Sequence, residues 1–486
     1  MTDGDMARLF HRLTSIEPVR KGTGWPVRET VDDPWIVTSF EPNDLDREPP
    51  PFKTYSTELP VVPLPRELPA PLGGTLAVLG GHATGAAALD LRQLARLLHL
   101  SAGVVRTEDR SGGRTIPFRA AGSAGGRFPL EVYVVAPEGT AGPPPGVHAY
   151  RPIQHDLVQI GPPPAGGTPA LVVTGVPWRT GWRYRERGYR HILWDAGTML
   201  SQQLVLAASA GLPARLYTLF PDLELRDLVG ADGIAEFPLA VLTLADAPPG
   251  WTPTARGAHG SIDSSPVHFP LVTATHWAGI DSRWGDPWEP GDAVRDPLPD
   301  SRPVNDVIYQ RGSTRLMDRS RGVPRDVLDT ALAVALRGIG LPHFVAVHDV
   351  DGVPPGLYGW PDLSEPVRGG NLRAELHRVT TGQGLAGDAA FVVITAADLT
   401  SISNRRYREL QLAAGLVEGR LHLAAYALGY GASGMSFLDS EIPGLVQEDL
   451  AAMLFTCVGV PEYTNRPGGP PGEPVHVRQV MPRVDD

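Results

Sequence analysis

The sequence predicts an α+β protein built from two similar units in one chain. Both halves run in the same order, from a helix through strands to a long helix and a further strand, and a stretch rich in Pro, Gly, Asp and Ser at 246–303 separates them. The two long helical patterns match at a constant offset of 218 positions, which relates Tyr189 to Tyr407 and Gly197 to Gly415. Such internal self-similarity indicates a duplicated unit.

Regular structure in the first unit is expected to start near Leu89. Leucines at helical spacing predict a helix at about 88–100, and runs rich in β-branched residues predict strands. The expected elements after that helix are a strand at 130–136, a small hairpin of 147–150 and 156–160, a strand at 170–175, a long helix at about 189–210 and a strand at 237–244.

The second unit repeats this order with its own elements. They are a helix near 324–337, strands near 343–348 and 390–396, a long helix at 405–428 and a strand at 453–459. We therefore divide the chain into an extended arm at 1–75, a first unit at 76–250, a connecting segment at 251–303, a second unit at 304–470 and a tail at 471–486.

The 1–75 arm is rich in proline and acidic residues, which predicts extended, irregular backbone. A disordered tail would have fewer aromatic residues than this arm has. We therefore expect the arm to wrap on the folded body. The aromatic residues scattered through it include Trp25, Trp35, Phe40, Phe52 and Tyr55.

Composition and charge exclude several classes of function. A net charge of −11 argues against a general nucleic-acid binder, which needs a basic face. The single Cys457 allows no intramolecular disulfide, and the histidines show no metal-ligand spacing, so we expect no metal site. The N-terminus lacks a signal-peptide pattern and no apolar run is long enough to span a membrane, so the expected location is the cytoplasm.

A short basic motif precedes the helix predicted at 324–337. Arg311 and Arg315 flank Ser313 in the run Arg-Gly-Ser-Thr-Arg. Guanidinium groups bind phosphate through charge-assisted, bidentate hydrogen bonds, and a hydroxyl with nearby backbone N–H groups can complete the cradle. The alternative for the motif alone is a solvated basic turn.

Two further segments could approach a ligand closely. The loop at 118–129 contains Ser123 among small residues, and Gly431-Ala432-Ser433-Gly434 follows the second long helix. Small residues let a ligand lie against the backbone, although an ordinary turn or a helix cap gives the same pattern. The stretch 178–186 is dense in Arg and aromatics, which suits a packing wall or a stacking surface. The longer stretch 178–190 could instead bind a partner protein or an acidic leader peptide.

Three of these segments resemble segments of FMN-dependent nitroreductases, and along the chain they follow the order 118–131, 311–315 and 431–441. The 311–315 motif resembles their flavin-phosphate motif, and the 118–131 segment resembles the Pro-Ser-Ala-Gly loop and following strand of azoline dehydrogenases, the SagB or thiazoline-oxidase branch. The 431–441 segment resembles their Gly-Ala-Thr/Ser-Gly segment. The resemblance implies tandem nitroreductase-like domains that form an intramolecular pseudo-dimer, with an antiparallel or mixed sheet flanked by helices.

The resemblance also implies one FMN site shared by the two units. Its cofactor-binding residues would be Arg311, Ser313, Arg315, Ser123, Gly431, Ala432, Ser433 and Gly434. The first unit lacks a basic motif before its first helix, the second lacks the Ser123 loop, and Arg215-Leu216 stand where the second unit has Ser433-Gly434. We therefore expect the equivalent second site to be degenerate.

The azoline dehydrogenases have a Lys-Tyr pair before the long helix that takes part in proton abstraction. The matching residues here are Arg183 and Tyr184, so this chain has an arginine where the family has the lysine. Arginine cannot act as the base because it stays protonated, but it can lower the pKa of a neighbouring tyrosine from about 10 toward neutrality. Tyr184 is therefore the expected base and Arg183 its electrostatic assistant.

The implied activity is FMN-dependent oxidation of thiazoline or oxazoline rings in a ribosomally made peptide, with O₂ re-oxidising the flavin. The implied partners are the azoline peptide and a cyclodehydratase that acts earlier, and a further homodimer remains open. Two alternatives remain. One is an NAD(P)H-dependent nitro- or ene-reductase, and the other is a flavin-free pseudoenzyme that binds a peptide in a biosynthetic complex. The chain has no dinucleotide-binding fingerprint, and this absence argues only weakly against the reductase.

Overall fold

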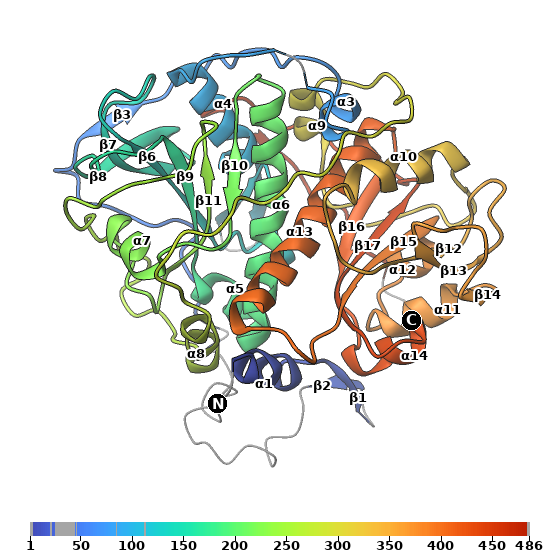
Figure 1. Cartoon of the computed structure of the whole chain (residues 1–486). Coiled ribbons are helices and arrows are strands. Elements are labelled where there is room, and N and C mark those ends of the chain that lie inside the picture. Colours follow the sequence, from blue (N-terminus) through green and yellow to red (C-terminus); the bar gives the residue numbers. More distant parts are fainter. Residues whose placement is uncertain are drawn as a thin grey trace.

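A computed structural model describes residues 3–19, 22–24, 44, 46–83, 85–110 and 113–483. The fold is the expected nitroreductase-like α+β architecture, in which antiparallel sheets are flanked by helices and two units lie side by side (Figure 1). Within the described ranges, no helix is both long enough and apolar enough to cross a membrane.

The helices and strands follow the duplicated order. The helices are α1 (Asp5–Leu13), α3 (Thr75–Leu79), α4 (Leu91–Ala102), α5 (Pro177–Tyr184), α6 (Gly188–Ala208), α7 (Asp222–Leu228), α8 (Pro270–Ala278), α9 (Val304–Gln310), α10 (Arg325–Ala335), α11 (Arg373–Val379), α12 (Leu385–Asp388), α13 (Asn404–Ala427) and α14 (Ile442–Val446). The strands are β1 (Glu17–Val19), β2 (Gly22–Gly24), β3 (Val61–Pro63), β4 (Val104–Arg110), β5 (Arg114–Arg119), β6 (Leu130–Ala136), β7 (Gly146–Arg151), β8 (Asp156–Gly161), β9 (Ala170–Gly175), β10 (Arg215–Tyr217), β11 (Phe237–Thr243), β12 (His343–Val347), β13 (Gly356–Trp360), β14 (Arg368–Gly369), β15 (Phe391–Ala397), β16 (Gly431–Met435), β17 (Ala451–Gly459) and β18 (Val475–His476).

Each unit is built on its own antiparallel sheet. The described strands of the first unit pair in the order β10-β11-β9-β6-β7-β8-β3, and those of the second in the order β14-β13-β12-β15-β17-β16. A third sheet joins the units, because β18 from the C-terminal segment pairs in parallel with β4, which pairs with β5. The segment predicted as a tail therefore crosses from the second unit back to the first.

The long helices α6 and α13 lie side by side at the centre of the molecule (Figure 1). A Cβ atom on Gly197 would lie 2.2 Å from the backbone oxygen of Leu412, and one on Gly415 would lie 2.2 Å from that of Trp194. Trp194 and Leu412 are themselves 218 positions apart, so the two contacts are equivalent. The repeated glycines are thus explained by a close crossing of two copies of the same helix.

A buried ion cluster lies at the start of α6. Asp439 accepts hydrogen bonds from Arg187 Nη1 at 2.8 Å and from Arg190 Nη1 at 2.6 Å. These two guanidinium groups hold the pKa of Asp439 far below its usual range. Nearby, Nδ1 of His11 on α1 lies 3.2 Å from the hydroxyl of Tyr407. The cluster fastens α1 to both long helices.

A matching cluster lies at the start of α13. Asp222 accepts hydrogen bonds from Arg405 Nη1 at 2.6 Å and from Arg408 Nη1 at 3.1 Å. The hydroxyl of Tyr189 lies 3.1 Å from Nδ1 of His276 on α8. These arginines and this tyrosine are related to those of the first cluster by the 218 offset, so α1 and α8 occupy equivalent places at the bottom of Figure 1.

The structure corrects two expectations about regular structure. It does not start near Leu89, because α1, α3 and β3 precede that residue. The connecting segment at 251–303 is not wholly irregular, because it contains α8. These three missed helices bury short apolar sets, such as Met6, Ala7, Phe10 and Leu13 of α1, within segments whose Pro, Gly and Asp content dominated the sequence pattern.

The described part of the arm packs on the folded body, as expected, with α1 against both long helices and the stretch around Lys53 against the first unit. Lys53 Nζ donates to Glu236 Oε2 at 2.5 Å and to Tyr133 Oη at 2.9 Å in a buried cluster. Arg119 lies over the ring of Phe52 at 5.3 Å. The predictions for Trp25, Trp35 and Phe40 lie outside the described residues.

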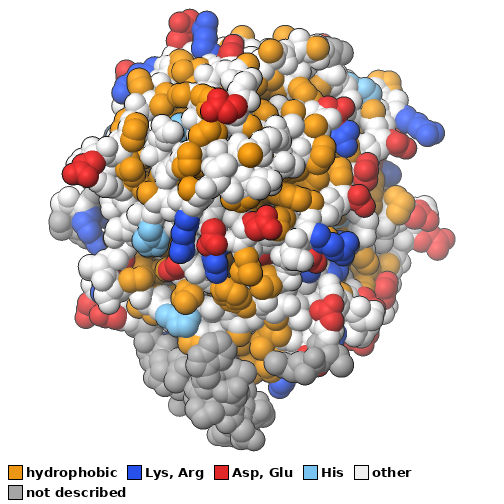
Figure 2. Space-filling view, turned by 60° about the vertical axis from the view of Figure 1, so that its left-hand side comes forward, with side chains coloured by type: hydrophobic (Ala, Val, Ile, Leu, Met, Phe, Trp, Pro, Cys, Tyr) orange, Lys and Arg blue, Asp and Glu red, His pale blue; other side chains and the backbone are white. Residues whose placement is uncertain are grey.

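Acidic and basic side chains are interspersed on the face shown in Figure 2, with hydrophobic side chains scattered between them. Mixed charges of this kind are typical of a solvated surface. A set of basic side chains that project together is found instead inside a cavity between the units, described next.

Candidate active site

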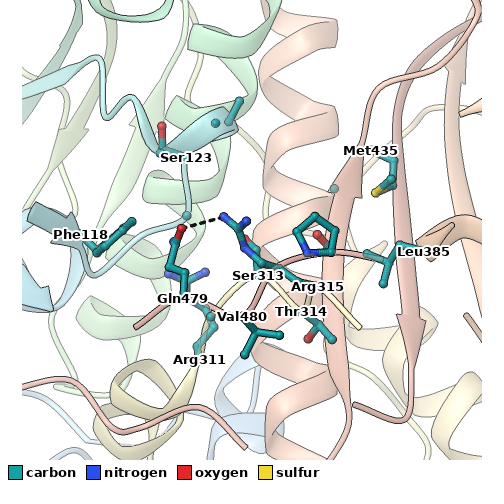
Figure 3. A pocket seen from close by; sticks show the side chains of 18 of the residues that line it. Phe118, Ser123, Arg311, Ser313, Thr314, Arg315, Leu385, Met435, Gln479 and Val480 are labelled. Atoms are coloured by element: carbon teal, nitrogen blue, oxygen red, sulfur yellow. Dashed lines mark hydrogen bonds between the residues drawn. The ribbon is translucent and has the colours of Figure 1, made fainter. Parts of the chain in front are cut away.

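A cavity of about 880 Å³ opens beside the crossing of α6 and α13, within the size range of ligand pockets in proteins (Figure 3). The first unit contributes the Ser123 loop, the end of α5 and one face of α6. The second unit contributes the loop after α9, part of β16 and the loop before α12. Residues between 463 and 483, the stretch that contains β18 and returns to the first unit, complete the wall. The site therefore requires both units.

Arg311 brings a buried positive charge to the cavity. Its side chain is only 3% exposed, and its Nη2 donates to the backbone oxygen of Ala120 at 2.5 Å. Its Nε and Nη1 have no hydrogen-bond partner in the described part of the chain. Burial lowers the pKa of Arg311, which reflects the cost of keeping the charge there. A buried, partly unsatisfied guanidinium calls for an anionic ligand.

Arg315 and Ser313 line the same part of the cavity (Figure 3). Arg315 Nη2 donates to Oε1 of Gln479 at 3.1 Å, and its backbone N–H donates to the hydroxyl of Tyr463 at 3.0 Å. Ser313 is exposed, and its hydroxyl makes no hydrogen bond within the described residues. The structure thus brings the three motif residues together on one part of the cavity wall.

The Ser123 loop is fastened to α6 by a carboxyl group. Ser123 Oγ donates to Asp195 Oδ2 at 2.5 Å and accepts from the backbone N–H of Phe128 at 2.8 Å. The backbone N–H of Ala124 donates to Asp195 Oδ1 at 2.9 Å. Burial raises the pKa of Asp195 to about 8. Because its hydroxyl is already bonded, Ser123 shapes the loop and the loop offers its backbone to the cavity.

The 431–434 segment divides into two roles. Ser433 and Gly434 line the cavity, and a Cβ on Gly434 would lie 2.3 Å from Glu418 Oε1. Gly431 and Ala432 lie outside the lining and hold the basic motif in place. A Cβ on Gly431 would lie 2.3 Å from Thr314 Oγ1, and Ala432 accepts a backbone hydrogen bond from Thr314 at 2.9 Å.

In β16, an edge strand, alternate residues direct their backbone groups to the same side. Ala432 uses its oxygen to bond Thr314 on the side away from β17. Gly434 therefore also directs its backbone N–H away from β17, at the position where the strand lines the cavity. This N–H is suited to a close contact with a ligand.

Arg183 and Tyr184 lie at the end of α5, on the cavity wall. The guanidinium carbon of Arg183 is 5.8 Å from the ring centre of Tyr184. The expected fall of the Tyr184 pKa is wrong in sign, because burial raises it and outweighs the opposite effect of Arg183. Tyr184 therefore carries its proton at neutral pH.

Sequence reasoning missed several lining residues, chiefly Asp195, Glu418, His191 and the 463–483 segment. A signal was present for the two acids. At the 218 offset, Asp195 of α6 corresponds to Ala413, and Glu418 of α13 corresponds to Leu200. An acidic residue in one copy and an apolar one in the other marks a position that the fold itself does not require to be charged.

The face that is equivalent by the repeat differs from this cavity. Arg215 stands there at the position equivalent to Ser433 and forms an ion pair with Asp246 at the surface. The strand therefore has a long side chain where β16 has a small one. The connecting segment lies along that face, because Trp288 N–H donates to the oxygen of Leu216 at 2.6 Å and Val294 N–H to that of Gly80 at 2.9 Å.

The chain has a nitroreductase-like fold of tandem form, and its likenesses to known proteins indicate an oxidoreductase. No protein-family model matches the chain. A nitroreductase-like protein of Methanocaldococcus jannaschii is 29% identical over 169 residues, which span 32% of this chain and 79% of the relative.

A solved structure shares the full tandem arrangement. A nitroreductase-like protein from Anabaena variabilis matches with a TM-score of 0.70 and 25% identity over 94% of this chain and 99% of that one. A chain of the Escherichia coli microcin synthetase McbBCD complex, solved with truncated pro-MccB17 bound, matches with a TM-score of 0.29 and 19% identity over 50% of this chain and 93% of that one.

Proposed function

We propose that this chain is an FMN-dependent dehydrogenase that oxidises thiazoline or oxazoline rings of a ribosomally made peptide to thiazole or oxazole. The observation that carries the flavin assignment is Arg311, a buried guanidinium beside a cavity that both units line, with two nitrogens that find no partner among the described residues. The ring-oxidising activity rests on the resemblance of the 118–131 and 431–441 segments to azoline dehydrogenases, whereas the 311–315 motif resembles nitroreductases in general.

The residues present fit FMN. Arg311 and Arg315 would neutralise its phosphate, and the Ser313 hydroxyl would donate a hydrogen bond to phosphate or ribityl oxygen. Gly434 and the backbone of the Ser123 loop would contact the ring from opposite units. When bound, the flavin supplies a two-electron acceptor that O₂ can re-oxidise.

Tyr184 is our candidate for moving the substrate proton, at its Oη. Since burial raises its pKa, the phenol must first lose its own proton to solvent water through the cavity, and the positive charge of Arg183 favours that loss. General acid–base groups contribute about 10²–10⁴-fold to rate. Tyr184→Phe should therefore slow ring oxidation at least about 100-fold while the protein still binds FMN. Full activity in this variant would remove Tyr184 from the mechanism.

A second candidate is an NAD(P)H-dependent reductase of small nitro or ene compounds. The protonated state of Tyr184 favours it, because reduction of a substrate needs a proton donor rather than a base. Steady oxidation of NADH or NADPH by the FMN-loaded protein, with a nitro or enone acceptor, would support the reductase over the dehydrogenase.

The deciding experiment starts from the visible spectrum of the purified protein after reconstitution with FMN, followed by release and identification of the flavin. The loaded protein is then incubated in air with a synthetic thiazoline peptide. Mass spectrometry should show the loss of two hydrogens per oxidised ring. A colourless protein that cannot be reconstituted would contradict the flavin assignment, and an unchanged peptide would contradict ring oxidation.

A further inference from the structure

A buried histidine on the cavity wall has no role in the proposed chemistry. His191 of α6 is 3% exposed and lines the cavity one helical turn before Asp195. Its ring stacks on Tyr184, with 4.1 Å between ring centres and 17° between planes, and it meets Trp194 edge-on at 4.6 Å. Neither Nδ1 nor Nε2 has a hydrogen-bond partner within the described residues.

The fold does not account for a histidine at this position. The duplicated helix offers an internal comparison, because the residue 218 positions later is Glu409 on α13. Its Oε1 accepts from Thr218 at 3.1 Å and its Oε2 accepts from Arg406 at 3.0 Å. At the equivalent position of the other long helix, the fold therefore holds a different side chain, and both of its oxygens are hydrogen-bonded. Leaving both nitrogens of His191 without partners costs stability, which a bound ligand could recover.

The surroundings keep His191 uncharged. Burial lowers its pKa well below the usual range, and the positive charges of Arg187, Arg190 and Arg183 lower it further. Asp439 acts in the opposite direction but less strongly, and the stacked Tyr184 is itself protonated. A neutral imidazole has one N–H donor and one acceptor nitrogen. Uncharged groups of the amide type, with carbonyl oxygens and N–H donors, match this pair.

We propose that His191 hydrogen-bonds an uncharged, amide-type group of the ligand in this cavity. The group is either the pyrimidine edge of the flavin or a backbone amide of the peptide substrate. This inference rests on the proposed function, because both sources are ligands of the proposed site. It assigns His191 as a ligand-positioning residue and not as the base.

The test measures how much each ligand raises the melting temperature of the full-length chain. His191→Phe keeps an aromatic ring against Tyr184 and removes both nitrogens, and His191→Gln restores one donor and one acceptor. His343→Phe is the matched control, because His343 is also 3% exposed but lies on β12, outside the cavity lining. The probes are FMN alone, and a synthetic thiazoline peptide added to protein saturated with FMN.

In the absence of ligand, His191→Phe and His343→Phe should each melt no lower than the wild type, since each removes buried polar atoms that have no partner within the described residues. With ligand, binding by His191→Phe should be roughly fivefold weaker, as expected for one lost hydrogen bond of about 1 kcal/mol, and His191→Gln should recover part of it. Weaker FMN binding assigns the flavin edge, and weaker peptide binding with FMN binding intact assigns the substrate amide.

Unchanged binding of both ligands by His191→Phe would overturn the inference and leave the proposed function standing. The proposed function is tested separately by the wild-type chain. If neither FMN nor the peptide raises its melting temperature, the proposed function fails and the inference about His191 fails with it.

Discussion

The two faces of the intramolecular dimer share their framework and differ in their chemistry. The close crossing at Gly197 and Gly415 is reciprocal, and the Arg-Arg-Asp cluster at the start of each long helix has a counterpart in the other unit. On one face Asp195 and Glu418 line an open cavity, whereas on the other face Ala413 and Leu200 occupy the equivalent positions.

This difference between the two faces shows which residues the fold needs. Interactions that occur twice, once in each unit, hold the helices and the interface together. Polar groups that occur once, such as Arg311, Asp195 and His191, have no counterpart in the other unit and lie together around the cavity. In this protein, loss of repeat symmetry is therefore a guide to the functional site.

The duplicated ion clusters should give the largest effects on stability. Asp439→Asn and Asp222→Asn each leave two arginines, buried except for the partly buried Arg405, without their carboxylate, a loss of about 3–5 kcal/mol in the free energy of unfolding. Urea denaturation at pH 7 would measure both. A large effect in only one variant would show that the clusters are not equivalent.

The cluster around Asp439 predicts that the free energy of unfolding depends on pH. Because the folded-state pKa of Asp439 is lowered, its contribution is fully present above its unfolded pKa of ~3.9 and is lost as the pH falls below that value. The difference in stability between wild type and Asp439→Asn should therefore shrink below about pH 4. A difference that stays constant down to pH 2 would contradict this assignment.

Ligand binding should separate the two faces. Arg311→Ala removes the buried guanidinium from the cavity, and lost hydrogen bonds to a charged group cost about 1.5–3 kcal/mol each, so FMN should bind on the order of 100-fold more weakly. Arg215→Ala, on the other face, removes only an exposed pair with Asp246 and should leave FMN affinity unchanged. Fluorescence titration of FMN measures both, and equal losses would show that both faces bind flavin.

The helix crossing should give a smaller and symmetric effect. Gly197→Ala and Gly415→Ala each place a methyl group against the backbone of the other helix, and overpacking of this kind costs about 1–3 kcal/mol. Thermal unfolding of the two variants should show similar losses. Two neutral substitutions would contradict the close crossing.

Much of the framework could be predicted from the sequence. Strands such as β9 and helices such as α6 and α13 carry strong local periodicity, and the repeat offset gave the tandem fold. The short helices α1 and α8 were missed because their stability comes from packing on the long helices, as with His11 and His276, and not from a long periodic pattern.

The candidate site could be predicted only in part. The 311–315 motif has a recognisable composition, and all three of its chosen residues line the cavity. Asp195 and Glu418 could not be chosen from composition, because an acid on a buried helix has meaning only once its neighbours are known. The sign of the Tyr184 pKa was missed for the same reason, since burial by the surrounding fold outweighs the effect of Arg183.

The number of flavins bound per chain tests the central claim most directly. The protein is reconstituted with excess FMN, freed of unbound flavin and denatured, and the released FMN is compared with the amount of protein. One functional face and one degenerate face predict about one FMN per chain, and about none for Arg311→Ala. A ratio near two would contradict the account, because it would require the face with Leu200, Ala413 and Arg215 to bind flavin as well.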